Sequence, residues 1–159
     1  MQTQSNADRR PALAPESDRV KQAEQFFKNL SAETLHLVDE FYDPAVQFVD
    51  PIHELQGSSA VKAYYKKLYE NADRVEFSFS ESIEQKDSVL LVWTMTLQTK
   101  ALNGGKPYSV DGNSLLHFGG GQGKVVYHRD YFDLGAFVYE RLPILRSIIT
   151  VIKKQMSKR

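Results

Sequence analysis

The sequence predicts an α+β fold in which a strongly curved, mostly antiparallel sheet wraps around N-terminal helices to form a cone, followed by a C-terminal helix. Apolar residues recur at helical spacing up to about residue 70, and from Arg74 onward they alternate with polar residues. The alternating segments are long, and long strands curl as they twist. Helices laid across the concave side would therefore leave an interior pocket. The 159 residues are the length of a single domain.

The first half of the chain carries three predicted helices and one short strand. Ser17 suits the N-cap of a helix whose apolar positions are Val20, Ala23, Phe26, Phe27 and Leu30. Ser31 suits the cap of a second helix, which ends at Asp43-Pro44 because the residue before proline avoids helical geometry. The strand 45–50 and a loop follow. The third helix carries an inner face of Val61, Tyr64, Tyr65, Leu68 and Tyr69.

Four further strands are predicted over residues 74–85, 88–102, 108–118 and 124–134. Turn-forming sequences separate them, namely Asp87-Ser88, Asn103-Gly104-Gly105 and the glycine-rich residues 119–123. Consecutive strands joined by short turns form an antiparallel meander, which supplies the sheet of the cone.

Both ends of the chain are predicted to lie outside a cone domain of residues 17–137. Residues 1–16 lack apolar periodicity and are expected to be a disordered leader; without an apolar signal core, a cytoplasmic location is the default. Residues 138–159 are expected to form an amphipathic helical extension that Pro143 breaks or restarts. We expect this helix to close the cone mouth or to pack on a dimer mate. Contact with a membrane surface or with a partner protein is the alternative.

Composition excludes several classes of protein. The 20 Lys and Arg residues balance the 20 Asp and Glu residues, which argues against an electrostatic grip on nucleic acid. The chain has no cysteine, so disulfides, thiolate nucleophiles and cysteine-ligated metals are excluded. A metal site could draw on His53, His128, Asp50 and Asp130, but no local ligand spacing supports one. Neither a metal nor an organic cofactor is expected.

The order of elements and the string FYDPAVQFVDPIHELQGSSAVKAYYKKLY (residues 41–69) resemble the SnoaL-like branch of the nuclear transport factor 2-like superfamily. The resemblance spans roughly residues 18–137. Its most specific parts are Asp50-Pro51, the segment 57–61 and the closing strand HRDYFD. The superfamily includes ketosteroid isomerase, polyketide cyclases, limonene epoxide hydrolase and scytalone dehydratase. The resemblance implies a cone-shaped fold that hosts enzymes, ligand binders and adaptors alike.

Asp50 is the first candidate catalytic residue. By strand parity it points to the same side as Val46 and Phe48, which a half-buried strand turns inward. A carboxylate among apolar neighbours suits a proton-accepting base, and the resemblance implies the same role, because the general base of ketosteroid isomerase occupies this position. The alternative is a loop cap, in which the carboxylate accepts backbone N–H groups near Ile52 or His53.

His128 and Asp130 are two residues apart and share one face of the last strand with Val126 and Phe132. A histidine beside a carboxylate suits proton transfer, with His128 as acid or relay and Asp130 as its orienting group. The alternative is an internal ion pair that stiffens the sheet edge. In limonene epoxide hydrolase the matching aspartate works within an Asp-Arg-Asp array. Here Trp93-Thr94-Met95 replaces the rest of that array, so epoxide hydrolysis by that mechanism is not expected.

The resemblance to ketosteroid isomerase also breaks at the oxyanion site. Phe26 and Ser114 stand where that enzyme uses a tyrosine and a protonated aspartate. Phenylalanine donates no hydrogen bond and serine is a weaker donor, so steroid isomerisation by the known route lacks its electrophile. Ser114 remains a candidate donor. The pocket walls are expected to include Trp93, Met95, Leu97, Leu116 and Phe132, with His53 at the mouth or exposed on its loop.

The sequence therefore predicts a protein with a pocket for a small apolar molecule. The leading hypothesis is a cofactor-independent enzyme that uses acid/base chemistry, of the isomerase, cyclase, dehydratase or hydrolase kind. The alternative is a non-catalytic binding or dimerisation module that holds an apolar ligand or a partner in the same cone.

A two-fold homodimer is the first testable prediction. The outward positions of the long strands carry more apolar and β-branched side chains than a solvent-exposed face needs. These positions are Val92, Thr94, Thr96, Leu115 and His117. Members of the resembled family pair through that face. Light scattering at micromolar concentration should return about twice the chain mass of 18.1 kDa. A value near the chain mass itself would contradict the prediction.

Overall fold

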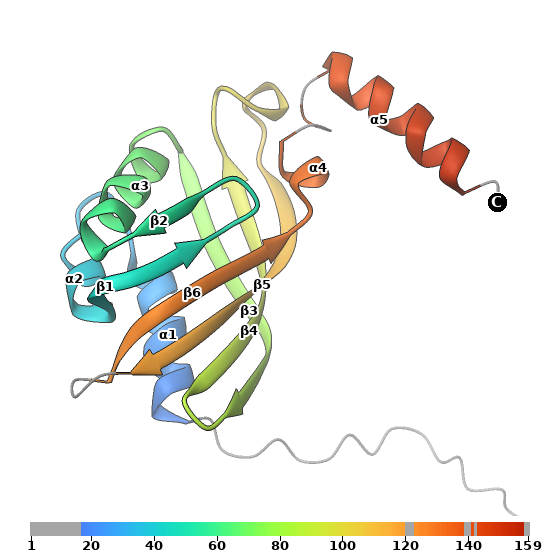
Figure 1. The fold of residues 1–159 in the computed structure, drawn as a ribbon. Coiled ribbons are helices and arrows are strands. Elements are labelled where there is room, and N and C mark those ends of the chain that lie inside the picture. The colour runs from blue at the N-terminus through green and yellow to red at the C-terminus, as the bar shows by residue number, and fades with distance from the viewer. Residues whose placement is uncertain (1–16, 120–122, 139–140, 142, 158–159) are drawn as a thin grey trace, which may run out of the picture.

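The computed structural model describes residues 17–119, 123–138, 141 and 143–157. The expected leader of residues 1–16 and part of the glycine-rich turn lie outside this range. Figure 1 shows the described elements as one curved sheet with helices beside it. The helices are α1 (Asp18–Asn29), α2 (Leu37–Phe41), α3 (Ser58–Glu70), α4 (Leu134–Phe137) and α5 (Pro143–Met156). The strands are β1 (Tyr42–Val49), β2 (Glu54–Gln56), β3 (Arg74–Gln85), β4 (Ser88–Gln98), β5 (Tyr108–Gly119) and β6 (Lys124–Phe132).

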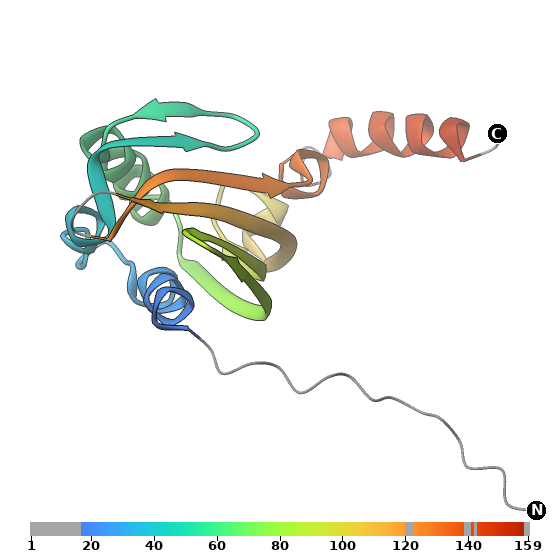
Figure 2. The same ribbon diagram turned by 60° about the horizontal axis from the view of Figure 1, so that its bottom comes forward.

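The six strands form a single sheet in the order β2-β1-β6-β5-β4-β3. Neighbouring strands are antiparallel except β1 and β6, which are parallel. The sheet is strongly curved and remains open between β2 and β3 (Figure 2). This architecture confirms the predicted α+β fold with a curved, mostly antiparallel sheet.

The helices cover the concave side of the sheet. Helix α1 packs on β3 and β4, and α3 packs on β1 and β2. The predicted cap at Ser17 is present, since its hydroxyl accepts the backbone N–H of Val20 at 3.1 Å. The second helix is shorter than expected, because the hydroxyls of Ser31 and Thr34 bond to nearby backbone groups and hold residues 31–36 in turns.

Strand β1 begins earlier than the sequence predicts. The expected helix end at Asp43-Pro44 lies inside this strand, which starts at Tyr42. Proline lacks the backbone N–H that a sheet ladder needs. The register between β1 and β6 shifts between Tyr42 and Gln47, so Pro44 lies in an irregular stretch of the pairing. This early start places the Tyr42 side chain in the core rather than on a helix.

Alternation along β4 and β5 separates the inside of the cone from its outside. Along β4 every second side chain from Val89 to Leu97 is buried, and those between them are half-buried on the outer face. Strand β5 follows the same rule at its two ends. The fully buried polar groups include His128, with Ser114 at 1% exposure. Polar side chains inside an apolar cone need partners, and these define the site described below.

Helix α5 begins at Pro143, where the sequence predicts a break or restart. Figures 1 and 2 show it extending away from the sheet and the other helices. The expectation that this helix closes the cone mouth is therefore wrong. Apolar side chains of α5 are left exposed instead, including Ile148 at 52% and Val151 at 55%.

Gly112 gives a testable prediction about the inner face. It pairs directly with Trp93, and a Cβ atom at this position would overlap the six-membered ring of the indole. Gly112→Ala must push the indole away, and we expect it to lower the free energy of unfolding by about 1–3 kcal/mol in urea denaturation. Asn113→Ala, on the outer face of the same strand, is the control and should change it by less than about 0.5 kcal/mol. Equal stability of Gly112→Ala and the wild type would contradict this packing.

Candidate functional site

A small cavity lies inside the cone, with a volume of about 40 Å³. Among the described residues that line it, Asp130 alone is charged and the remainder are mostly aromatic. The lining consists of Phe27, Tyr64, Tyr65, Leu68, Tyr69, Phe77, Trp93, Met95, Ser114, Asp130, Phe132 and Phe137. A space of this size holds no more than a few water molecules. The interior of the cone is therefore largely filled by its own side chains.

The two oxygens of Asp130 have different surroundings. Oδ1 accepts hydrogen bonds from the Ser114 hydroxyl at 2.5 Å and from His128 Nε2 at 2.7 Å. In the part of the chain that the structure describes, no group bonds to Oδ2, and no buried polar side-chain atom there lacks a partner. Oδ2 is therefore the oxygen that retains access, in a side chain that is 16% exposed. One carboxylate oxygen is held, and the other is available to a ligand.

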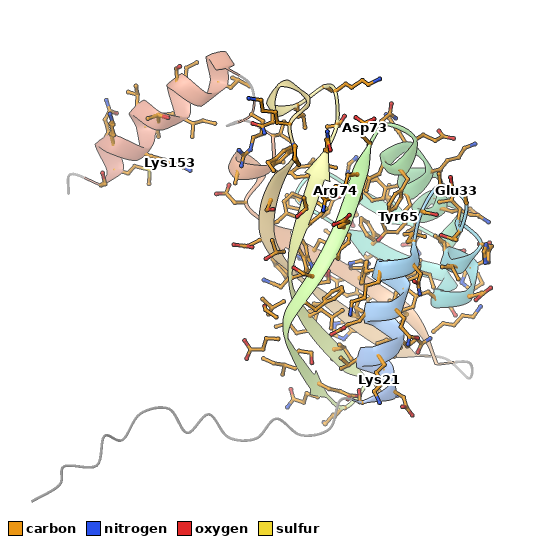
Figure 3. All side chains as sticks on the ribbon, turned by 180° about the vertical axis from the view of Figure 1, so that it is seen from behind. Lys21, Glu33, Tyr65, Asp73, Arg74 and Lys153 are labelled. Atoms are coloured by element: carbon orange, nitrogen blue, oxygen red, sulfur yellow. The ribbon has the colours of Figure 1, made fainter. Side chains whose placement is uncertain are left out.

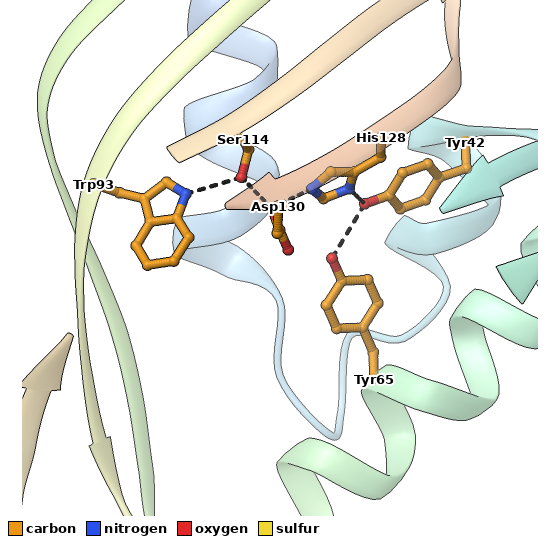
Figure 4. A network of polar contacts seen from close by, with 6 residues as sticks. All are labelled: Tyr42, Tyr65, Trp93, Ser114, His128 and Asp130. Atoms are coloured by element: carbon orange, nitrogen blue, oxygen red, sulfur yellow. Dashed lines mark hydrogen bonds and ion pairs between the residues drawn. The ribbon is translucent and has the colours of Figure 1, made fainter. Parts of the chain in front are cut away.

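The bonds at Asp130 continue in both directions along a network of six residues (Figure 4). The Trp93 indole N–H donates to the Ser114 hydroxyl at 2.9 Å. On the other side, His128 Nδ1 lies 2.7 Å from the Tyr42 hydroxyl, which lies 3.1 Å from the Tyr65 hydroxyl. The network thus runs from β4 through β5, β6 and β1 to α3.

Proton positions in this network follow from the chemistry of its groups. An ionised carboxylate only accepts, so the Ser114 hydroxyl and His128 Nε2–H both donate to Asp130. An indole nitrogen only donates, so Trp93 leaves the Ser114 hydroxyl free to do so. In the neutral imidazole Nδ1 then accepts from Tyr42, and Tyr42 accepts from Tyr65. Every hydrogen bond in the network therefore points toward Asp130.

Strand register brings these side chains together. Ser114 on β5 pairs with Asp130 on β6, and Leu116 pairs with His128 one step further along the same face. Residues two apart on a strand share a face, so His128 and Asp130 both point inward, as the sequence predicts. Trp93 reaches the same place from β4 because Gly112 opposite it has no side chain.

A larger hollow of about 480 Å³ opens at one end of the cone. Its walls are mainly apolar, with Leu68, Ala72, Leu97, Leu102, Phe132 and Phe137 among them, and Lys67, Asn71 and Thr99 add polar groups. Tyr64, Leu68, Phe132 and Phe137 also line the interior cavity, so they form the partition between the two spaces. The Tyr108 hydroxyl donates to the Phe137 carbonyl oxygen at 2.8 Å, which fixes α4 across this end of the cone.

Asp50 lies in the wall of the hollow, and its side chain is only 1% exposed. Its Oδ1 accepts the backbone N–H groups of Ile52 at 2.7 Å and of His53 at 2.6 Å. His53 Nδ1 lies 3.1 Å from both carboxylate oxygens. This is the loop cap that the sequence offers as the alternative to a catalytic base. The carboxylate nevertheless lies near Tyr64, which lines both the hollow and the interior cavity.

Tyr64 lies between the two carboxylates. Burial raises its pKa well above the usual 10.0, and the negative charges of Asp50 and Asp130 raise it further. Burial likewise raises the pKa of Tyr42 and of Tyr65. Burial also raises the pKa of Tyr69. These phenols therefore stay protonated at neutral pH, and because Tyr42 and Tyr65 already donate within the network, Tyr64 is the phenol that lies beside both carboxylates.

The predicted site residues fall into three groups. Trp93, Met95, Ser114 and Asp130 line the interior cavity, while Asp50, His53 and Leu97 line the hollow, and Phe132 lines both. His128, Phe26 and Leu116 line neither space. His128 is fully buried with both ring nitrogens bonded, Phe26 stacks on Phe41 at 4.1 Å, and Leu116 is fully buried in the core.

Sequence reasoning missed the tyrosines at this site. The sequence predicts Tyr64 and Tyr65 only as part of the inner face of a helix, and Tyr42 falls within the predicted second helix. A buried tyrosine usually finds a partner for its hydroxyl, and that was the available signal. Among the described residues, no group of three or more His, Asp or Glu side chains is arranged to hold a metal ion.

The curved sheet and the helices on its concave side form a cone of the nuclear transport factor 2-like fold. More narrowly, the chain belongs to the SnoaL-like domain family, whose model matches residues 23–128. A search of the curated proteins returned no match. Within the described residues, no helix is both long enough and apolar enough to cross a membrane.

Solved structures share this fold at low sequence identity. A proposed SnoaL-like polyketide cyclase from Jannaschia sp. CCS1 is 18% identical with a TM-score of 0.67, covering 80% of this chain and 94% of that one. A hypothetical protein with a ketosteroid isomerase-like fold from Catenulispora acidiphila, in complex with trimethylamine, is 15% identical with a TM-score of 0.65, covering 78% and 91%. A proposed polyketide cyclase from Acidithiobacillus ferrooxidans is 20% identical with a TM-score of 0.64, covering 79% and 95%.

The buried tyrosines predict a loss of stability in alkali. In the unfolded chain tyrosine ionises near pH 10, whereas burial keeps Tyr65 protonated to higher pH in the folded state. Unfolding therefore releases protons above about pH 10, and the free energy of unfolding should fall by about 1.4 kcal/mol per pH unit for each such tyrosine. Urea denaturation between about pH 9 and pH 11 measures this slope.

Tyr65→Phe should make that slope shallower by about 1.4 kcal/mol per pH unit, which corresponds to one proton released on unfolding. Tyr131→Phe is the control, because Tyr131 is 44% exposed. A Tyr65→Phe variant with the wild-type slope would contradict the burial of this phenol.

Proposed function

We propose that this protein is an enzyme that transfers protons on a small apolar substrate, with Asp130 as the general base. The observation that carries the proposal is the free Oδ2 of Asp130 in an aromatic cavity, while Oδ1 is held by Ser114 and His128. A general base must reach the proton that it removes and must be held in position. Asp130 meets both conditions.

The other groups have supporting roles. His128 reaches neither cavity nor hollow, so it acts as a positioning residue for Asp130 rather than as a group that touches substrate. Tyr64 lines both spaces, and its raised pKa keeps the hydroxyl protonated. That hydroxyl can donate to an oxygen that gains negative charge when a neighbouring proton is removed. Asp50 shapes the mouth by holding the loop of residues 50–53.

The sizes of the two spaces constrain the substrate. Only a small reacting group fits in the 40 Å³ cavity, so the body of the substrate must lie in the 480 Å³ hollow. The partition residues Tyr64 and Phe132 would then contact both parts. An apolar body and one acidic C–H or O–H group match these walls. Isomerisation, cyclisation and dehydration can begin with removal of such a proton, whereas in hydrolysis the base would take the proton of an attacking water molecule.

A non-catalytic ligand-binding module is the second candidate. The observation that favours it is the tight filling of the cone, which leaves most of the open volume in the hollow rather than next to Asp130. A binder would use the apolar walls and would not need Oδ2 of Asp130. The two candidates therefore differ in what happens when this carboxylate is replaced.

The test pairs two aspartates on the same sheet. Trp93 is the only tryptophan and lines the interior cavity, so quenching of its fluorescence identifies apolar compounds that bind. For a compound that the wild type converts, Asp130→Asn should lower turnover by about 10²–10⁴-fold and change affinity little. Asp111→Asn is the matched control, because Asp111 is exposed on the outer face and bonds to Thr94.

Asp50→Asn separates the two carboxylates. It should weaken the loop and change affinity while leaving turnover of bound substrate within about threefold, since Asp50 is occupied by backbone N–H groups. Ligands that bind but undergo neither turnover nor exchange of a proton with deuterated solvent would favour the binding module instead. Loss of turnover in Asp50→Asn with normal turnover in Asp130→Asn would contradict the proposed base.

A further inference from the structure

Helix α5 carries an apolar stripe that the rest of the described chain leaves uncovered. Leu145 is 38% exposed, Ile148 52%, Ile152 49% and Met156 73%. These residues are three or four positions apart, so they lie on one side of the helix. Figure 3 shows α5 from behind, again separate from the sheet, with Lys153 on it. An exposed stripe of this kind marks an interaction surface.

Charge along this segment has one sign. From residue 141 to residue 159 the sequence contains no Asp or Glu, and its basic residues are Arg141, Arg146, Lys153, Lys154, Lys158 and Arg159. Two copies of α5 packed stripe to stripe would bring two such basic segments together, and neither segment contains Asp or Glu. A partner that matches both the apolar stripe and the positive charge must offer an apolar layer beneath an anionic surface.

We propose that α5 docks the protein on the surface of an anionic lipid bilayer. Its apolar stripe would lie at the boundary between headgroups and acyl chains, and the positive charge of its basic residues would attract the anionic headgroups. The helix has 14 residues and is about 21 Å long, shorter than the roughly 30 Å of a bilayer core. It therefore lies in the plane of the surface rather than across it.

The short connection between α4 and α5 limits the distance between the cone and a docked α5. Phe137 of α4 lines the hollow, and five residues separate it from Pro143. A connection of that length spans at most about 20 Å. A docked α5 therefore keeps the open end of the cone close to the bilayer.

Co-sedimentation of the full chain with vesicles tests the proposal. The protein should bind vesicles of phosphatidylcholine with about one-third phosphatidylglycerol at least tenfold more tightly than vesicles of phosphatidylcholine alone. Raising the salt should weaken that binding, because the attraction to lipid phosphates is screened.

Variants assign the binding to α5. Ile148→Ser with Ile152→Ser should lower the partition coefficient by about tenfold or more, because the stripe loses two of its apolar anchors. Lys154→Glu should lower it by a similar factor, since it reverses one charge near the lipid surface. Ile83→Ser and Lys21→Glu are the controls and should bind like the wild type. Ile83 is 54% exposed on β3, and Lys21 is exposed on α1.

Two results would overturn the proposal. One is the absence of binding to anionic vesicles, or binding that the α5 variants leave unchanged. The other is a wild type that does not bind vesicles but forms an oligomer in light scattering, when the Ile148→Ser, Ile152→Ser variant does not form that oligomer. That result would assign the stripe to a second copy of the chain.

Discussion

A charged carboxylate inside an aromatic cone is the constraint on which the rest of the site depends. Burying an ionised group without partners costs several kcal/mol, so Asp130 requires donors at fixed positions. Ser114 and His128 supply them from the neighbouring strand and from the same strand. Because these donors need partners in turn, the requirement extends to Trp93 on β4 and to Tyr42 on β1. One charge thereby ties together strands that are distant in sequence.

The same network limits what each residue can do. Both nitrogens of His128 are bonded and the ring is fully buried, so it can hold Asp130 but cannot meet a ligand. Oδ2 of Asp130 remains accessible, and protonated tyrosines surround it. A carboxylate that accepts and the Tyr64 phenol that can donate, in a site that excludes most water, form a matched pair for proton transfer. The tight filling of the cone restricts that chemistry to a small group on a larger molecule.

Alternation along the strands made much of this structure predictable from sequence. The bounds of β3 agree with the sequence-based expectation, and the inward direction of His128, Asp130 and Trp93 follows from period-two parity alone. Contacts between distant segments were not predictable in this way. Tyr42 and His128 are 86 positions apart, and only the parallel pairing of β1 with β6 brings them together. The length of α2 was not predictable either, because hydroxyl groups before it bond to the backbone in turns. The position of α5, away from the sheet, likewise does not follow from the pattern of its own residues.

The central claim is that Asp130 is an ionised acceptor to which His128 donates from Nε2. A long-range ¹H–¹⁵N correlation spectrum of the His128 ring tests it most directly, because it reports which nitrogen carries hydrogen. The structure predicts a proton on Nε2, facing Asp130 at 2.7 Å. A ring protonated only on Nδ1 would mean that Asp130 itself carries the shared proton, and would contradict its role as a base.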